Sequence, residues 1–271
     1  MITGARCPDA PPTRFVVLTT QRAGSTWLID TLNSHPSVVA YGELFLQDGR
    51  GTPPWGAQDV VRWREHLARL RSGTPGCSRR EALVAYLDAL FAPRPGAVAI
   101  GFKLMYGQAG EYPQIGEYMT ARGCSVVHLI RRNVLDVQIS REAAVARDLF
   151  HVSREEKVAP ARVRLDARSL VRQLERLEQE VARARKQLAA RDLATVEVCY
   201  EDLVSDPGTF GRVLEFLQVP RAGQPLLSRL QKIVKLPHPQ TLANYDEVRR
   251  VLSGTRFSEL LGGNEPPLPR G

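Results

Sequence analysis

One short segment near the N-terminus constrains the fold more than any other part of the chain. An apolar run at residues 15–18 leads into the polar loop Thr-Thr-Gln-Arg-Ala-Gly-Ser-Thr-Trp at residues 19–27, and a helical pattern follows. A strand that feeds a loop and then a helix makes an anion-binding site, because the first helical amides have no partner within the helix. The loop adds a cationic fork, a glycine for close backbone approach and two hydroxyls, from Arg22, Gly24, Ser25 and Thr26.

This loop differs from the Walker A loop of P-loop kinases. That pattern, G-x-x-x-x-G-K-S/T, places a Lys directly before the Ser or Thr, whereas Gly24 directly precedes Ser25 here. Taken alone, the loop is also compatible with an ordinary strand-to-helix turn capped by Ser25.

A second strand end carries the same kind of chemistry. Residues 125–130 form a branched apolar run that ends at Arg131 and Arg132, and a helical pattern follows. Arg132 and Ser140 are eight residues apart, so a residue at the strand end and one about two turns into the helix can reach one anion. Surface arginines at a helix start give a similar pattern, but two such sites in one chain favour binding over coincidence.

The wider pattern alternates strands with helices. We expect strands at 14–19, 37–41, 97–103, 125–130 and 195–199, and helices at 25–33, 57–71, 79–91, 111–122, 134–147 and 166–191. This alternation predicts an α/β fold, a P-loop-like three-layer structure with a central parallel sheet and helices on both faces. Ligands bind such sheets at the carboxyl ends of the strands, where Arg22, Lys103 and Arg132 fall.

Three segments, in this order along the chain, resemble one enzyme family. Residues 21–27 resemble the loop that holds the 5′-phosphosulfate in sulfotransferases that use 3′-phosphoadenosine 5′-phosphosulfate (PAPS). Residues 132–140, R-N-x-x-D-x-x-x-S, are similar to that family's 3′-phosphate site, and residues 200–203, Tyr-Glu-Asp-Leu, to the segment whose Tyr lies near the adenine. Within the family the chain most resembles bacterial carbohydrate sulfotransferases of the trehalose and nodulation-factor type, on residues 41–43, 101–105 and 244–247.

The resemblance implies PAPS as donor, 3′-phosphoadenosine 5′-phosphate (PAP) as product, and no metal. The acceptor that it implies is a hydroxyl on a sugar or a glycosylated metabolite. The donor-binding residues that it implies are Arg22, Ala23, Gly24, Ser25, Thr26, Trp27, Arg132, Ser140, Tyr200 and Lys235.

Catalysis by such an enzyme needs cations near the transferred group and a base for the acceptor hydroxyl. We expect Arg22 to neutralise the bridging oxygen, Lys103 to act as a second cation and Glu43 to act as the general base. Many cytosolic relatives place a His two residues after this Lys, but Leu and Met follow Lys103 here. His35 and His151 are reserve candidates for the base.

Charge and cysteine content agree with this interpretation. A net charge of +8 and a pI near 9.6 suit a polyanionic ligand, while the arginines are too evenly spread to indicate nucleic-acid binding. The four cysteines, at positions 7, 77, 124 and 199, form no C-x-x-C pair. With neither a signal-like N-terminus nor an apolar run of about 20 residues, we expect a reduced, cytoplasmic enzyme without a membrane span.

The remaining features concern organisation. We expect one domain over residues 1–271, with flexible tails at 1–13 and 262–271. The leucine-rich stripe of 166–191 favours packing on the protein's own core, with a homodimer seam as the alternative. Residues 148–165 are a candidate lid over the acceptor. The rival functions are a P-loop nucleotide or metabolite kinase and a non-catalytic nucleotide-binding protein.

Overall fold

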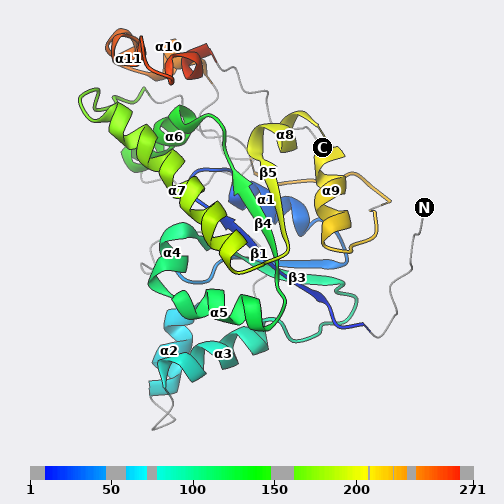
Figure 1. Cartoon of the computed structure of the whole chain (residues 1–271). Coiled ribbons are helices and arrows are strands. Elements are labelled where there is room, and N and C mark those ends of the chain that lie inside the picture. The colour runs from blue at the N-terminus through cyan, green and yellow to red at the C-terminus, as the bar shows by residue number, and fades with distance from the viewer. Residues whose placement is uncertain are drawn as a thin grey trace.

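A single parallel sheet organises the chain. The computed structural model describes residues 10–46, 59–71, 78–147, 162–206, 208–221, 223–230 and 236–262. Within them the strands pair in parallel in the order β2-β3-β1-β4-β5 (Figure 1). The strands are β1 (Thr13–Thr19), β2 (Val38–Glu43), β3 (Ala99–Met105), β4 (Ser125–Ile130) and β5 (Thr195–Cys199). The predicted α/β class and its parallel sheet are therefore confirmed.

Alternation along the strands gives the sheet two apolar faces. In β1, Val16 and Leu18 join one buried cluster, whereas Phe15 and Val17 join the other. The first cluster is covered by α2 (Trp63–Arg71), α3 (Arg79–Leu90), α5 (Pro113–Ala121) and the C-terminal half of α7 (Leu170–Ala190). The second is covered by α1 (Ser25–Leu32), α8 (Tyr200–Ser205) and α9 (Gly208–Phe216). Helices on both faces make the predicted three-layer arrangement.

A third apolar cluster lies at the end of the molecule that carries α10 (His238–Thr241) and α11 (Tyr245–Leu252) (Figure 1). It joins the N-terminal half of α7 to α6 (Val134–Arg147), α11 and the 3-10 helix η1 (Ser258–Gly262). The short α10 precedes α11. Leu170, Leu174 and Leu177 are buried here. The leucine stripe predicted for residues 166–191 therefore packs on the protein's own core.

The helix predicted over 111–122 is present as α5 (Pro113–Ala121). A further helix, α4 (Tyr106–Glu111), was not predicted and ends just before α5 begins. Tyr112 between them has φ −121° and ψ 69°, outside the helical region, because a residue before proline avoids helical angles. Helices α8 to α11 were not predicted, and β3 continues two residues beyond Lys103. No helix in the described ranges is both long and apolar enough to cross a membrane.

Candidate active site

The loop between β1 and α1 has a tight conformation at the carboxyl edge of the sheet. Arg22 has φ 65° and Gly24 has φ 88°, both in the left-handed region that side chains rarely adopt. A Cβ atom at Gly24 would lie 2.2 Å from Cδ2 of Tyr200, so only glycine lets this ring pack against the loop. The predicted phosphosulfate loop and the Tyr expected near the adenine therefore meet in the structure.

Two arginine side chains converge on this loop. Arg22 Nε donates to Ser140 Oγ (3.0 Å), and Arg131 Nη1 donates to the backbone carbonyl of Arg22 (3.2 Å). The Arg131 guanidinium also lies over the Tyr200 ring, 5.0 Å from its centre. Burial, together with the charge of Arg131, lowers the pKa of Arg22 to about 10. A bound anion would relieve this repulsion, so the arrangement suits an anionic ligand. Sequence reasoning missed Arg131, although it directly follows Ile130, the last residue of β4.

The two predicted catalytic residues on β2 and β3 contact each other. Glu43 pairs with Lys103 across the strands, after a register shift that follows Tyr41. Lys103 Nζ lies 2.6 Å from Glu43 Oε1 and donates to Thr26 Oγ1 (2.9 Å), at the start of α1. Lys103 is only 2 % exposed, and this burial lowers the pKa of its ammonium, an effect that Glu43 partly offsets. A buried cation, a carboxylate and a loop hydroxyl are thus assembled at one point.

Arg132 has different surroundings from those expected. Its guanidinium forms a forked ion pair with Asp202, with Nη1 3.0 Å from Oδ2 and a second contact from Nη2 to Oδ1. The carboxylate of Glu201 accepts from the backbone amides of Arg132 (3.1 Å) and Asn133 (3.0 Å), directly before α6. Arg132 and Ser140 were predicted to grip one anion together. In this structure Arg132 is bound to Asp202, while Ser140 is bound to Arg22.

Comparison with known proteins gives this site a family. Residues 14–234 match the family model described as Stf0 sulphotransferase. The chain belongs to this family. It is 25% identical over 242 residues to Nodulation protein H of Rhizobium meliloti and of its strain 1021, covering 88% of this chain and 91% of each relative. The protein is therefore a sulfotransferase.

Two solved structures are also similar to this sulfotransferase. One is the crystal structure of a sulfotransferase from Alicyclobacillus acidocaldarius, with TM-score 0.46, 17% identity, and coverage of 80% of this chain and 84% of that chain. The other is the sulfotransferase domain of the Synechococcus PCC 7002 olefin synthase, with TM-score 0.41, 14% identity, and coverage of 96% and 98%.

His35, the first reserve candidate for the base, lies at the opposite edge of the sheet. Its Nε2 bonds the carbonyl of Pro220 (3.0 Å), and its Nδ1 accepts from the amide of Ser37 (3.1 Å). The Ser37 carbonyl accepts from the amides of Val98 and Ala99, where β3 begins. The strand ends that carry Glu43 and Lys103 lie at the other edge, so the sulfotransferase cannot use His35 as its base in this conformation.

His128, within the apolar strand β4, has a structural role. It is 1 % exposed, with Nε2 bonded to Tyr106 Oη (2.7 Å) and Nδ1 to Glu197 (3.0 Å). Burial lowers its pKa, which favours the neutral ring. In the described ranges no three His, Cys, Asp or Glu side chains are grouped to hold a metal ion. The second reserve base, His151, lies outside the described residues.

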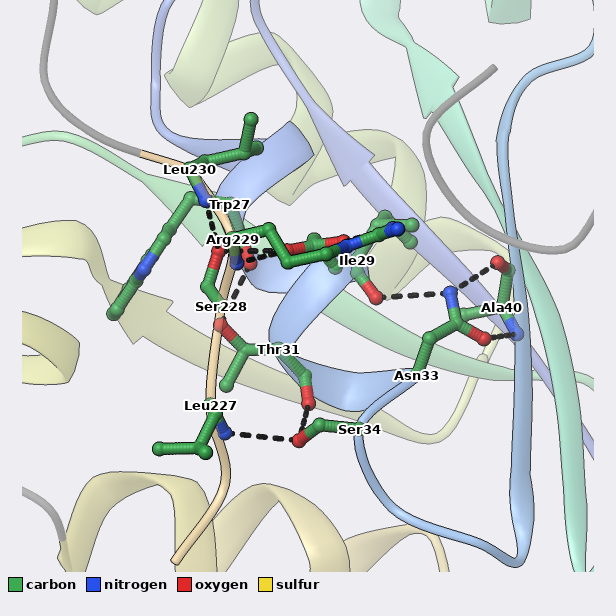
Figure 2. A network of polar contacts seen from close by, with 11 residues as sticks. Trp27, Ile29, Thr31, Asn33, Ser34, Ala40, Leu227, Ser228, Arg229 and Leu230 are labelled. Carbon is green, nitrogen blue, oxygen red and sulfur yellow. Dashed lines mark hydrogen bonds and ion pairs between the residues drawn. The ribbon is translucent and has the colours of Figure 1, made fainter. Parts of the chain in front are cut away.

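A polar network binds residues 227–230 to α1 (Figure 2). This helix follows residues 20–24, which we call the anion loop. Asp30, 4 % exposed, accepts from Ser228 Oγ (2.8 Å) and from the amide (2.7 Å) and Nη2 (2.8 Å) of Arg229. Leu227 donates its amide to Ser34 Oγ (3.0 Å). The network holds the chain against α1 just before Lys235, the predicted donor contact, which lies outside the described residues.

Proposed function

We propose that this sulfotransferase moves the sulfuryl group of PAPS to a hydroxyl of a carbohydrate or a glycosylated metabolite and releases PAP. The observation that carries the proposal is the contact of Glu43, Lys103 and Thr26 beside the anion loop. Family membership supports the reaction, and the similarity to Nodulation protein H supports a carbohydrate acceptor.

The loop and its neighbours would bind the two anionic ends of the donor. The amides at the start of α1, with the hydroxyls of Ser25 and Thr26, suit the 5′-phosphosulfate, and Tyr200 suits the adenine. Arg132 suits the 3′-phosphate, provided that it leaves Asp202. The 3′-phosphate carries a charge of about −1.5 to −2 against the single charge of Asp202, so an exposed guanidinium can exchange the carboxylate for the phosphate. Lys235 stays a predicted contact to the same phosphate.

Transfer then needs one base and two cations. Glu43 accepts the proton of the attacking hydroxyl as its oxygen bonds to sulfur. Arg22 and Lys103 stabilise the negative charge that grows on the bridging oxygen, which leaves with PAP when its bond to sulfur breaks. Because Lys103 touches both Glu43 and Thr26, it can hold the base in place beside the transferred group. Positioning of this kind supplies much of the rate of group transfer.

The decisive variant is Glu43→Gln, which keeps the shape of the side chain but cannot take a proton. With radiolabelled PAPS and a panel of sugars and glycosides, we expect turnover to fall about 10²–10⁴-fold. The affinity for PAP, measured by calorimetry, should change less than about threefold, because Glu43 is not assigned to the donor. Turnover within about threefold of the unmodified enzyme would assign the base to another residue. If the unmodified protein bound PAP tightly but transferred sulfate to none of the acceptors, the non-catalytic alternative would be favoured.

A further inference from the structure

A buried histidine from the C-terminal part of the chain contacts the helix that borders the anion loop. His238 opens α10 and is 5 % exposed, and its Nε2 lies 2.6 Å from Asp136 Oδ1 on α6. A carboxylate only accepts hydrogen bonds, so Nε2 carries the proton. The other ring nitrogen, Nδ1, is buried and has no hydrogen-bond partner among the residues that the structure describes. Such an unpaired atom costs about 1–3 kcal/mol, which an apolar side chain would avoid. Packing alone therefore does not explain why a histidine, and not an apolar side chain, lies against Asp136.

Asp136 links His238 to the arginines of the site. Its other oxygen, Oδ2, lies 3.3 Å from Nη2 of Arg131, and both side chains are 12 % exposed. Arg131 in turn donates to the carbonyl of Arg22 and lies over the Tyr200 ring. The polar row is thus His238, Asp136, Arg131 and the anion loop.

The position of Asp136 on α6 gives the row a second connection. Ser140, which binds Arg22 Nε, lies four residues further along the same helix. Residues four apart lie on one helical face, one turn from each other. Asp136 therefore binds Arg131, and Ser140 binds Arg22, from the same face of α6. His238 bonds the first of them, Asp136.

We propose that His238 is a positioning residue for donor binding. It fixes the carboxylate of Asp136, and so keeps Arg131 against the loop and over Tyr200 in the arrangement that binds the nucleotide. This inference rests on the proposed function, since the ligand it concerns is the adenine nucleotide of the donor. His238 itself contacts no reacting group in this role; it acts through Asp136.

Two amide variants test which ring nitrogen matters. In His238→Gln the amide nitrogen falls near the place of Nε2 and can donate to Asp136, whereas in His238→Asn it falls near the place of Nδ1 and cannot. We expect calorimetry with PAP to show affinity within about threefold of the unmodified protein for Gln and a loss of about tenfold for Asn. In an Asp136→Ala background, the Asn substitution should weaken binding by less than about twofold further, because the row is already broken.

Asn244→Ala is the matched control. Asn244 is a buried polar residue of the same C-terminal part, and it bonds the backbone amide (3.1 Å) and carbonyl (2.9 Å) of Leu165 rather than Asp136. We expect it to lower the melting temperature at least as much as His238→Asn and to leave PAP affinity unchanged. Equal losses of affinity in His238→Asn and Asn244→Ala, or unchanged affinity in His238→Asn, would overturn the inference. If the unmodified protein bound no PAP, the proposed function would fail and this inference with it.

Discussion

Two ion pairs at the carboxyl edge of the sheet differ sharply in their surroundings. In the Lys103–Glu43 pair, between β3 and β2, the side chains are 3 % and 16 % exposed. In the Arg132–Asp202 pair, beyond β4 and β5, they are 55 % and 37 % exposed. Breaking a buried pair leaves a charge without compensation, whereas an exposed pair exchanges partners at little cost.

This difference matches the two tasks that we assign to the edge. The transfer end needs a base and a cation in fixed positions, and burial holds Glu43 and Lys103 together. The donor end has to release its internal partner each time a nucleotide binds, and exposure allows Arg132 to do so.

The largest difference should appear in stability. Lys103→Met removes the ammonium and leaves Glu43 without it, so we expect the free energy of unfolding to fall by about 3–5 kcal/mol. Arg132→Met, which breaks the exposed pair by the same kind of change, should cost less than about 1 kcal/mol. Urea denaturation of the two variants gives both values. Equal losses would show that the two pairs do not differ in kind.

Donor affinity should respond in the opposite way. Arg132→Met removes the contact to the 3′-phosphate that we propose, and charge-assisted bonds contribute about 1.5–3 kcal/mol, so PAP affinity should fall about 10–100-fold. The measurement is calorimetry at fixed ionic strength, with 5′-AMP as the control ligand because it lacks the 3′-phosphate. An equal loss of affinity for PAP and for 5′-AMP would show that Arg132 does not bind the 3′-phosphate.

A smaller gain is expected when the internal competitor is weakened. Asp202→Asn keeps the shape of the side chain but removes its charge, so Arg132 gives up less when phosphate binds. Since the exposed pair is worth about 0–1 kcal/mol, PAP should bind about two- to fivefold more tightly. The gain should disappear in the Arg132→Met background. Weaker binding in Asp202→Asn would mean that Asp202 orients Arg132 for the ligand instead of competing with it.

The smallest expected effect is a displaced pH profile. Burial disfavours the charged ammonium of Lys103 and lowers its pKa below the ordinary lysine value of 10.5. In the mechanism that we propose the protonated lysine is the active form, so kcat/KM should decline as pH rises through this lowered pKa. In Lys103→Arg the guanidinium stays charged, and the decline should move to higher pH. An unmoved alkaline limb would assign it to another group.

Local sequence patterns predicted much of this edge. Apolar runs and the loop chemistry located β1, β4 and the helices that follow them, because these elements depend on neighbouring residues. Glu43 and Lys103 were predicted separately at two strand ends, and the parallel sheet brings such ends to one edge. The leucine-rich stripe of α7 was likewise visible in the sequence, and its burial follows from the leucines.

Pairings over long distances along the chain could not be predicted in the same way. Arg132 meets Asp202, 70 residues away, and His238 meets Asp136, 102 residues away. No periodicity encodes these partners; they depend on how α8 and α10 pack beside α6. Arg131 was overlooked because its neighbour Arg132 fitted the family pattern, whereas its own role is visible only from its contacts with Arg22 and Tyr200.

The most direct test of the account is metal-free calorimetry with PAP, beside ATP with and without Mg²⁺. We expect PAP to bind tightly without metal and ATP to bind weakly in both conditions, because the loop lacks the Walker lysine and because we assign Arg132 to the 3′-phosphate of the donor. Binding of ATP that requires Mg²⁺, with no preference for the 3′-phosphorylated nucleotide, would contradict the account and favour a kinase.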